Sequence, residues 1–68
     1  MKEVKSSNIS HIGYEDGKLL VKFKSSPDKV YEYPGVTEAE HHAFVNADSI
    51  GSHFAAHIKG RDFTKREA

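Results

Sequence analysis

An Asp-Gly pair flanked by alternating apolar residues is the feature that most constrains what this chain can fold into. The pair is Asp16-Gly17, and a type I′ turn needs positive φ at both central positions, which these residue types tolerate. A two-residue turn there sets Tyr14 opposite Leu19 and Ile12 opposite Val21. Apolar side chains then face apolar side chains across the pair, so turn chemistry and patterning predict one hairpin register.

A third strand is predicted at residues 30–34, where Tyr31 and Tyr33 share one face. The preceding run, Ser26-Pro27-Asp28, is rich in turn-forming residues. A three-residue loop places both tyrosines on the core face, whereas an even-numbered loop would bury Glu32 without a partner, which costs several kcal/mol. We therefore expect the odd loop, with the cross-strand pairs Phe23–Tyr31, Val21–Tyr33 and Lys22–Glu32.

Two helices are predicted after the third strand. The first begins at a capping box, Thr37-Glu38-Ala39-Glu40, and is expected to reach about Ala47. Asp48 and Ser49 are both good N-cap residues for a second helix, and Gly60 suits its C-terminal end. The apolar face of that second helix repeats at i, i+4 and i+8, with Ile50, Phe54 and Ile58.

This element order predicts an α+β fold: a three-stranded antiparallel sheet with both helices packed on one face. A chain of 68 residues has room for one domain, which we assign to residues 1–68. The polar segments 1–7 and 64–68 are expected to be flexible. Because the sequence contains no cysteine, disulfides and thiolate metal sites cannot support the fold, and stability has to come from packing.

The charges cancel in number but are unevenly distributed. Ten Lys and Arg residues balance ten Asp and Glu residues, which argues against a dedicated sequence-blind nucleic-acid binder. Cations nevertheless gather along the second strand and in the C-terminal tail, so any nucleic-acid binding is expected to use Lys22, Lys24, Lys59, Arg61, Lys65 and Arg66. Phe63 in that tail either folds back as a core residue or remains available to a partner. An ordinary solvated surface would give the same pattern, and of the two interpretations of this charge distribution it is the one that we favour.

A metal site and an enzyme active site are both weakly indicated. His53 and His57 are spaced i, i+4, as in zinc-binding helices, and His41 or His42 could supply a third ligand. His57 falls at the edge of the apolar helix face, however, so packing is the simpler role for it, and we expect no metal and no cofactor. The serines lie in turns and caps and no phosphate-binding glycine loop is present. We therefore expect no catalytic residues, no enzymatic activity and no small-molecule substrate.

The Tyr31-x-Tyr33 strand, the Pro34-Gly35-Val36 turn and the later Ser49, Gly51, Phe54 and Ile58 together resemble the KTSC domain family. That family occurs at the C-terminus of some lysyl-tRNA synthetases and as small stand-alone bacterial and phage proteins, and RNA binding has been suggested for it. The resemblance extends from about Ser6 to Phe63. Ala55 departs from it, since many members carry a polar residue there. Gly13, Ser49, Gly51 and Arg61 are the matching positions whose role the fold alone explains least.

We therefore expect a small non-catalytic binding domain whose partner is RNA. The alternative is a protein–protein interaction module that uses the edge strand or the helix pair. A phage origin would be compatible with this alternative. No apolar run follows Met1, so we expect no signal peptide, no contact with a membrane and a cytoplasmic location.

Overall fold

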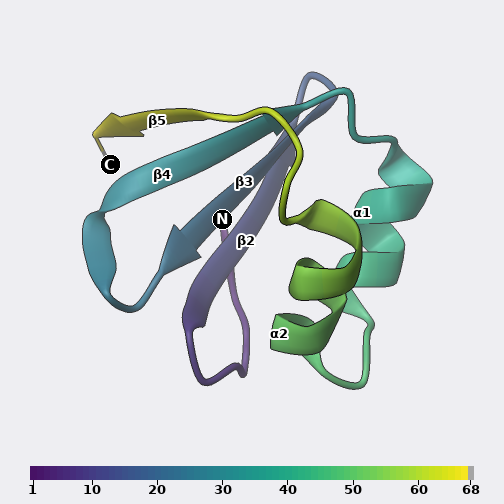
Figure 1. Cartoon of the computed structure of the whole chain (residues 1–68), viewed down its shortest axis with the longest axis horizontal. Coiled ribbons are helices and arrows are strands. Elements are labelled where there is room, and N and C mark those ends of the chain that lie inside the picture. The colour runs from purple at the N-terminus through teal and green to yellow at the C-terminus, as the bar shows by residue number, and fades with distance from the viewer. Residues whose placement is uncertain (68) are drawn as a thin grey trace.

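Five antiparallel strands form one sheet whose spatial order follows the chain order (Figure 1). The computed structural model describes residues 1–67. The α+β class is confirmed, but the prediction of three strands is wrong because both ends of the chain add an edge strand to the sheet. The predicted flexibility of the segments 1–7 and 64–68 stays a prediction, and Ala68 lies outside the described residues. The strands are β1 (Lys2–Glu3), β2 (Ile9–Glu15), β3 (Lys18–Phe23), β4 (Ser26–Pro34) and β5 (Thr64–Glu67).

The central hairpin of β2 and β3 has the predicted turn and register. Asp16 has a φ of 53° and Gly17 a φ of 74°, so both residues adopt the left-handed conformation that a type I′ turn requires. Ile12 pairs with Val21, as predicted from the alternation of apolar residues. This hairpin supplies the middle of the sheet, against which the helices pack.

The pairing of β3 with β4 differs from the prediction by two residues. Tyr33 lies opposite Leu19 and Tyr31 opposite Val21, so the tyrosines keep the predicted face but have different partners. The chain turns at residues 24–25 rather than 26–28. The register then shifts between Val21 and Phe23. This irregularity in the pairing, rather than a three-residue loop, brings both tyrosines to the core face.

The predicted partner of Glu32 is also wrong. Glu32 lies opposite Leu20, not Lys22, and its carboxylate contacts Arg66 Nε at 2.7 Å. It also accepts a hydrogen bond of 3.3 Å from the Thr64 hydroxyl. Both partners lie on β5, the strand that was not predicted, so the acidic side chain is neutralised across the β4–β5 pair.

The helical segment begins as predicted and contains an unpredicted π-helical turn. Helix α1 (Glu38–Val45) starts with the complete Thr37–Glu40 capping box and ends two residues before Ala47. Helix α2 (Ile50–His53) begins at Ser49, whose hydroxyl accepts the Ser52 N–H, and continues into the π-helix η1 (Phe54–Ile58). Gly60 follows with a φ of 97°. None of the helices within residues 1–67 is long and apolar enough to cross a membrane.

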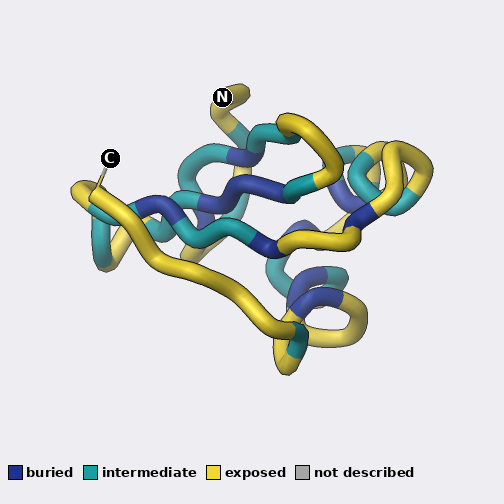
Figure 2. The backbone as a smooth tube through the Cα atoms, turned by 90° about the horizontal axis from the view of Figure 1, so that it is seen from above, coloured by how far each residue is buried: buried dark blue, intermediate teal, exposed yellow. Residues whose placement is uncertain are grey.

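The hydrophobic core lies between one face of the sheet and both helices, as predicted. Figure 2 shows the buried backbone concentrated in the central strands and on the sides of the helices nearest to them, while β5 is exposed along its length. Tyr33 is 4% exposed within this core. The buried cluster consists of Ile9, Ile12, Leu19, Val21, Tyr33, Val36, Phe44, Ile50, Phe54 and Ile58.

Candidate functional site

The six cations predicted to bind nucleic acid are divided between the two faces of the sheet. Side chains alternate along a strand, so Lys22 lies on the face opposite to its core neighbour Val21. The β4–β5 register pairs Tyr31 with Lys65, and it pairs Val30, the preceding residue of β4, with Arg66. Lys65 is therefore on the helix side of the sheet, and Arg66 is on the open side with Lys22. These cations do not form one basic patch.

Two of the six cations take part in ion pairs that join elements of the fold. Arg66 pairs with Glu32, as described above. The Arg61 guanidinium contacts the Glu40 carboxylate, and Arg61 Nε donates to the His57 carbonyl oxygen at 3.0 Å. Hydrogen bonds from the Thr37 backbone and from Arg61 hold the pKa of Glu40 below its ordinary value. Arg61 therefore links the start of α1 to the end of η1, and its role in RNA binding stays a prediction.

A groove lies between the β3–β4 hairpin and η1, and one of the six cations lines it. The groove has a volume of about 420 Å³, and none of the described residues that line it is acidic. Lys59, at the end of η1, forms part of its wall. Lys24 is exposed in the β3–β4 turn, and its N–H donates to the Asn8 carbonyl oxygen at 2.9 Å. We call this feature the aromatic groove because its walls include the rings of Phe23, Tyr31, Tyr33, Phe54 and Phe63.

The rings of the aromatic groove form a packed network with an open side. Phe63 is 50% exposed, and its ring centroid lies 5.3 Å from that of Tyr31 and 5.5 Å from that of Tyr33. Lys65 Nζ lies 5.7 Å from the centroid of the Tyr31 ring, a cation–π distance. Burial raises the pKa of Tyr33, which belongs to the core. The two alternatives predicted for Phe63 were a core position and an exposed position available to a partner. In the structure the ring folds back onto the tyrosines and keeps an exposed surface.

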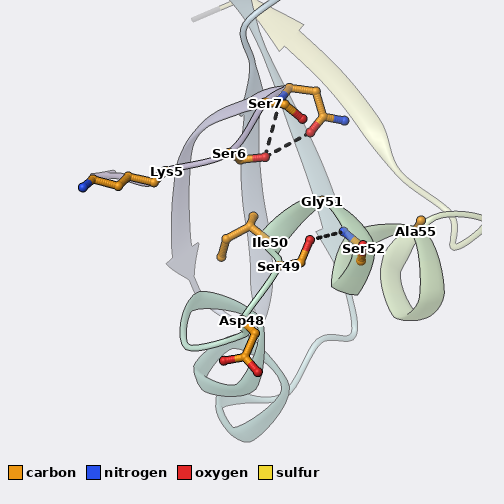
Figure 3. A pocket seen from close by; sticks show the side chains of 10 residues that line it. Lys5, Ser6, Ser7, Asp48, Ser49, Ile50, Gly51, Ser52 and Ala55 are labelled. Atoms are coloured by element: carbon orange, nitrogen blue, oxygen red, sulfur yellow. Dashed lines mark hydrogen bonds between the residues drawn. The ribbon is translucent and has the colours of Figure 1, made fainter.

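A second hollow adjoins the aromatic groove on the N-terminal side of α2 (Figure 3). Its volume is about 450 Å³, and we call it the hydroxyl hollow because four serines line it: Ser6, Ser7, Ser49 and Ser52. Gly51 lies between this hollow and the aromatic groove. A Cβ atom on Gly51 would come within 3.3 Å of Asn8 Oδ1, so glycine lets the loop before β2 approach the helix closely.

Two further positions singled out in the sequence have structural roles. A Cβ atom on Gly13 would lie 2.9 Å from Met1 Cγ, so glycine there makes room for the N-terminal side chain on the open face. His53 stacks on Phe44 with ring centroids 5.5 Å apart, and its ring is 4.5 Å from that of His57. No group of three His, Cys, Asp or Glu side chains within residues 1–67 is arranged to hold a metal ion. The predicted lack of a metal site stays a prediction.

The fold and its grooves define a small α+β domain in which an antiparallel five-stranded sheet carries a short helical segment on one face. The KTSC domain family matches residues 5–63, and the chain belongs to that family. The chain is also similar to a KTSC domain protein from Yersinia pestis whose crystal structure is known. That similarity has 38% sequence identity and a TM-score of 0.82, and it covers 98% of this chain and 93% of the other. None of the curated proteins matches the chain. The family resemblance stated from the sequence is confirmed.

Proposed function

We propose that this domain is a non-catalytic binding module that holds an unpaired segment of RNA in the aromatic groove. The observation that carries the proposal is the exposed ring of Phe63, supported from behind by Tyr31 and Tyr33. Proteins recognise single-stranded RNA by stacking splayed bases on aromatic side chains, and each stacked base contributes about 1–3 kcal/mol. Because Tyr33 is a core residue, we assign the stacking surface to Phe63 and the half-buried Tyr31.

The charges around the aromatic groove suit a phosphate backbone. Lys59 lines the groove, Lys65 lies over the Tyr31 ring, and Lys24 is exposed in the neighbouring turn. No described lining residue carries a negative charge that would repel phosphate. Three phosphate contacts would give a slope of log K against log salt of about −2, since each contact to a single strand contributes about −0.7. We therefore expect weak binding that is lost as salt is raised.

The proposal is tested by fluorescence anisotropy with a labelled single-stranded RNA at low salt. Phe63→Ala should weaken binding about 5- to 150-fold, which corresponds to one stacked base. The double reversal Lys59→Glu/Lys65→Glu should weaken binding further than its matched control, Lys18→Glu/Lys22→Glu. The control makes the same change in charge on the face of β3 that points away from the helices. We expect the control to weaken binding less than the groove variant at low salt, and the gap between the two variants to widen as salt approaches about 0.1 M, where a Debye length of about 10 Å screens charges on the far face.

Two results would contradict the proposal. The first is no binding by the wild type at roughly 100 µM, which is the weak end of non-specific binding. The second is unchanged affinity in Phe63→Ala. Either would favour the alternative of a protein-interaction module. The edge strand β5 (Thr64–Glu67) is the observation that supports this alternative, since its residues are all exposed and it pairs only with β4.

A further inference from the structure

The aromatic groove and the hydroxyl hollow adjoin each other along the helical segment. Asn8, Gly51 and Ala55 line both of them. The Asn8 side chain lies close to Gly51 and separates the two hollows at that point, whereas Ala55 contributes only an exposed methyl group. An extended ligand in the aromatic groove can therefore reach the hydroxyl hollow by lying across Ala55. The chemistry of the hollow then determines which part of such a ligand it accepts.

The hydroxyl hollow contains two hydroxyl groups that the fold does not use. The Ser6 hydroxyl donates to Asn8 Oδ1 at 3.0 Å, and the Ser49 hydroxyl accepts the Ser52 N–H at 3.3 Å. Within residues 1–67, the hydroxyls of Ser7 and Ser52 make no hydrogen bond to the protein. Figure 3 shows that Ser7 belongs to the loop on one side of the hollow and Ser52 to the helix on the other. Two unused donor–acceptor groups therefore line the hollow, one from the loop and one from the helix.

The charges of the hydroxyl hollow favour a neutral ligand group over a phosphate. Lys5 and Asp48 are the charged residues that line it, so its formal charges cancel. Within the described part of the chain, the Asp48 carboxylate has no cation within ion-pair distance. An unpaired carboxylate repels phosphate, but it readily accepts hydrogen bonds from sugar hydroxyls, as acidic residues do for ribose in dinucleotide-binding proteins. Uncharged hydroxyl groups fit this hollow better than anions do.

We propose that the hydroxyl hollow receives the ribose next to the base stacked on Phe63, and that the domain thereby distinguishes RNA from DNA by the 2′-hydroxyl. This inference rests on the proposed function, because it takes the strand to lie in the aromatic groove. The 2′-hydroxyl is both a donor and an acceptor, and it is the group by which proteins separate RNA from DNA. Ser7, Ser52 and Asp48 together offer the complementary donors and acceptors.

The test compares an RNA octamer of uridines with the DNA octamer of deoxyuridines, which carries the same bases. The wild type should bind the RNA about 2- to 13-fold more tightly, the factor that corresponds to one net hydrogen bond. The variant Ser7→Ala/Ser52→Ala should bind RNA as weakly as DNA and should leave the affinity for DNA unchanged. The control Ser25→Ala removes a hydroxyl from the aromatic groove and should preserve the ratio of RNA to DNA affinity. Urea denaturation confirms that each variant is folded.

The outcomes separate this inference from the proposed function. If the wild type binds both octamers equally, or if the double variant keeps the preference for RNA, the ribose site is refuted. Binding that remains sensitive to Phe63→Ala in those cases leaves the proposed function standing. If the wild type binds neither octamer at roughly 100 µM, both the proposed function and the ribose site are refuted.

Discussion

Replacing Arg61 by alanine should destabilise the domain by about 1–2 kcal/mol. The guanidinium contacts Glu40, and the two side chains are 33% and 39% exposed, so solvent screening leaves that pair only a small contribution to stability. The additional hydrogen bond from Arg61 Nε to the His57 carbonyl oxygen, at 3.0 Å, contributes about 0.5–1.5 kcal/mol. A core of this size supplies only about 3–5 kcal/mol in total, so the loss would be a large fraction of the stability.

The assay is urea denaturation followed by circular dichroism, with Arg61→Lys and Glu40→Gln as companion variants. Lysine keeps the positive charge but cannot reach both acceptors with one planar group, so it should recover less than half of the loss. A double-mutant cycle between Arg61→Ala and Glu40→Gln should give a favourable coupling, since the two side chains belong to one contact. A loss below about 0.3 kcal/mol together with no coupling would show that the contact is an ordinary surface pair. It would also free Arg61 for the RNA contact predicted from the sequence.

Three further predictions concern the core and the histidines. Tyr33→Ala should cost about 3–5 kcal/mol and leave little folded protein in a thermal melt, since the ring is 4% exposed; a loss below about 1 kcal/mol would place the ring in solvent. Burial, followed by the nearby His57, lowers the pKa of His53, so the unfolded chain binds more protons and stability should fall as pH drops below about 6.5. His53→Gln should flatten the dependence of the urea midpoint on pH between about 7.5 and 5.5, and an equally steep dependence in that variant would contradict this assignment. Zinc at near-stoichiometric concentration should not raise the melting temperature; a clear rise that His53→Ala removes would reveal a metal site.

The central hairpin could be predicted because its information is local. Asp16-Gly17 dictates the turn, and the residues on either side alternate in a way that permits only one register. The helix starts were predictable for the same reason, since the Thr37 and Ser49 caps satisfy amide groups within three residues.

The outer strands and the β3–β4 register could not be predicted because they depend on distant contacts. β1 and β5 are short and have no apolar alternation, and β5 is held by main-chain pairing and by ion pairs such as Lys29–Glu67 at 2.7 Å. Because β5 was not predicted, Lys22 was the only evident partner for Glu32. Pairing these two residues favours a β3–β4 register that differs by two residues from the observed one. Only the face of the sheet on which the tyrosines lie could be predicted. It follows from the burial of Tyr33 and does not depend on which β3 residue lies opposite.

The candidate site was only partly visible in the sequence. The cations were recognised, but the sequence carried no signal that Arg61 would contact Glu40, 21 residues earlier. Phe63 was recognisable as an isolated aromatic residue in a polar tail, and its fold-back onto Tyr31 depends on β5 pairing with β4. The hydroxyl hollow arises where the loop before β2 meets the helical segment, and the aromatic groove arises where the β3–β4 hairpin meets it, so no local pattern could reveal either of them.

The long connection between β4 and β5 affects when the fifth strand joins the sheet during folding. Strands β2 to β4 are joined by two-residue turns, whereas β5 follows a connection that contains the entire helical segment. Closing that longer loop costs about 2 kcal/mol more in chain entropy, and the four residues of β5 are all exposed, so they return little apolar burial. We therefore expect β5 to dock last in folding and to detach first in local opening. Because Phe63 immediately precedes β5, each such opening would uncover the aromatic groove while the central hairpin stays folded.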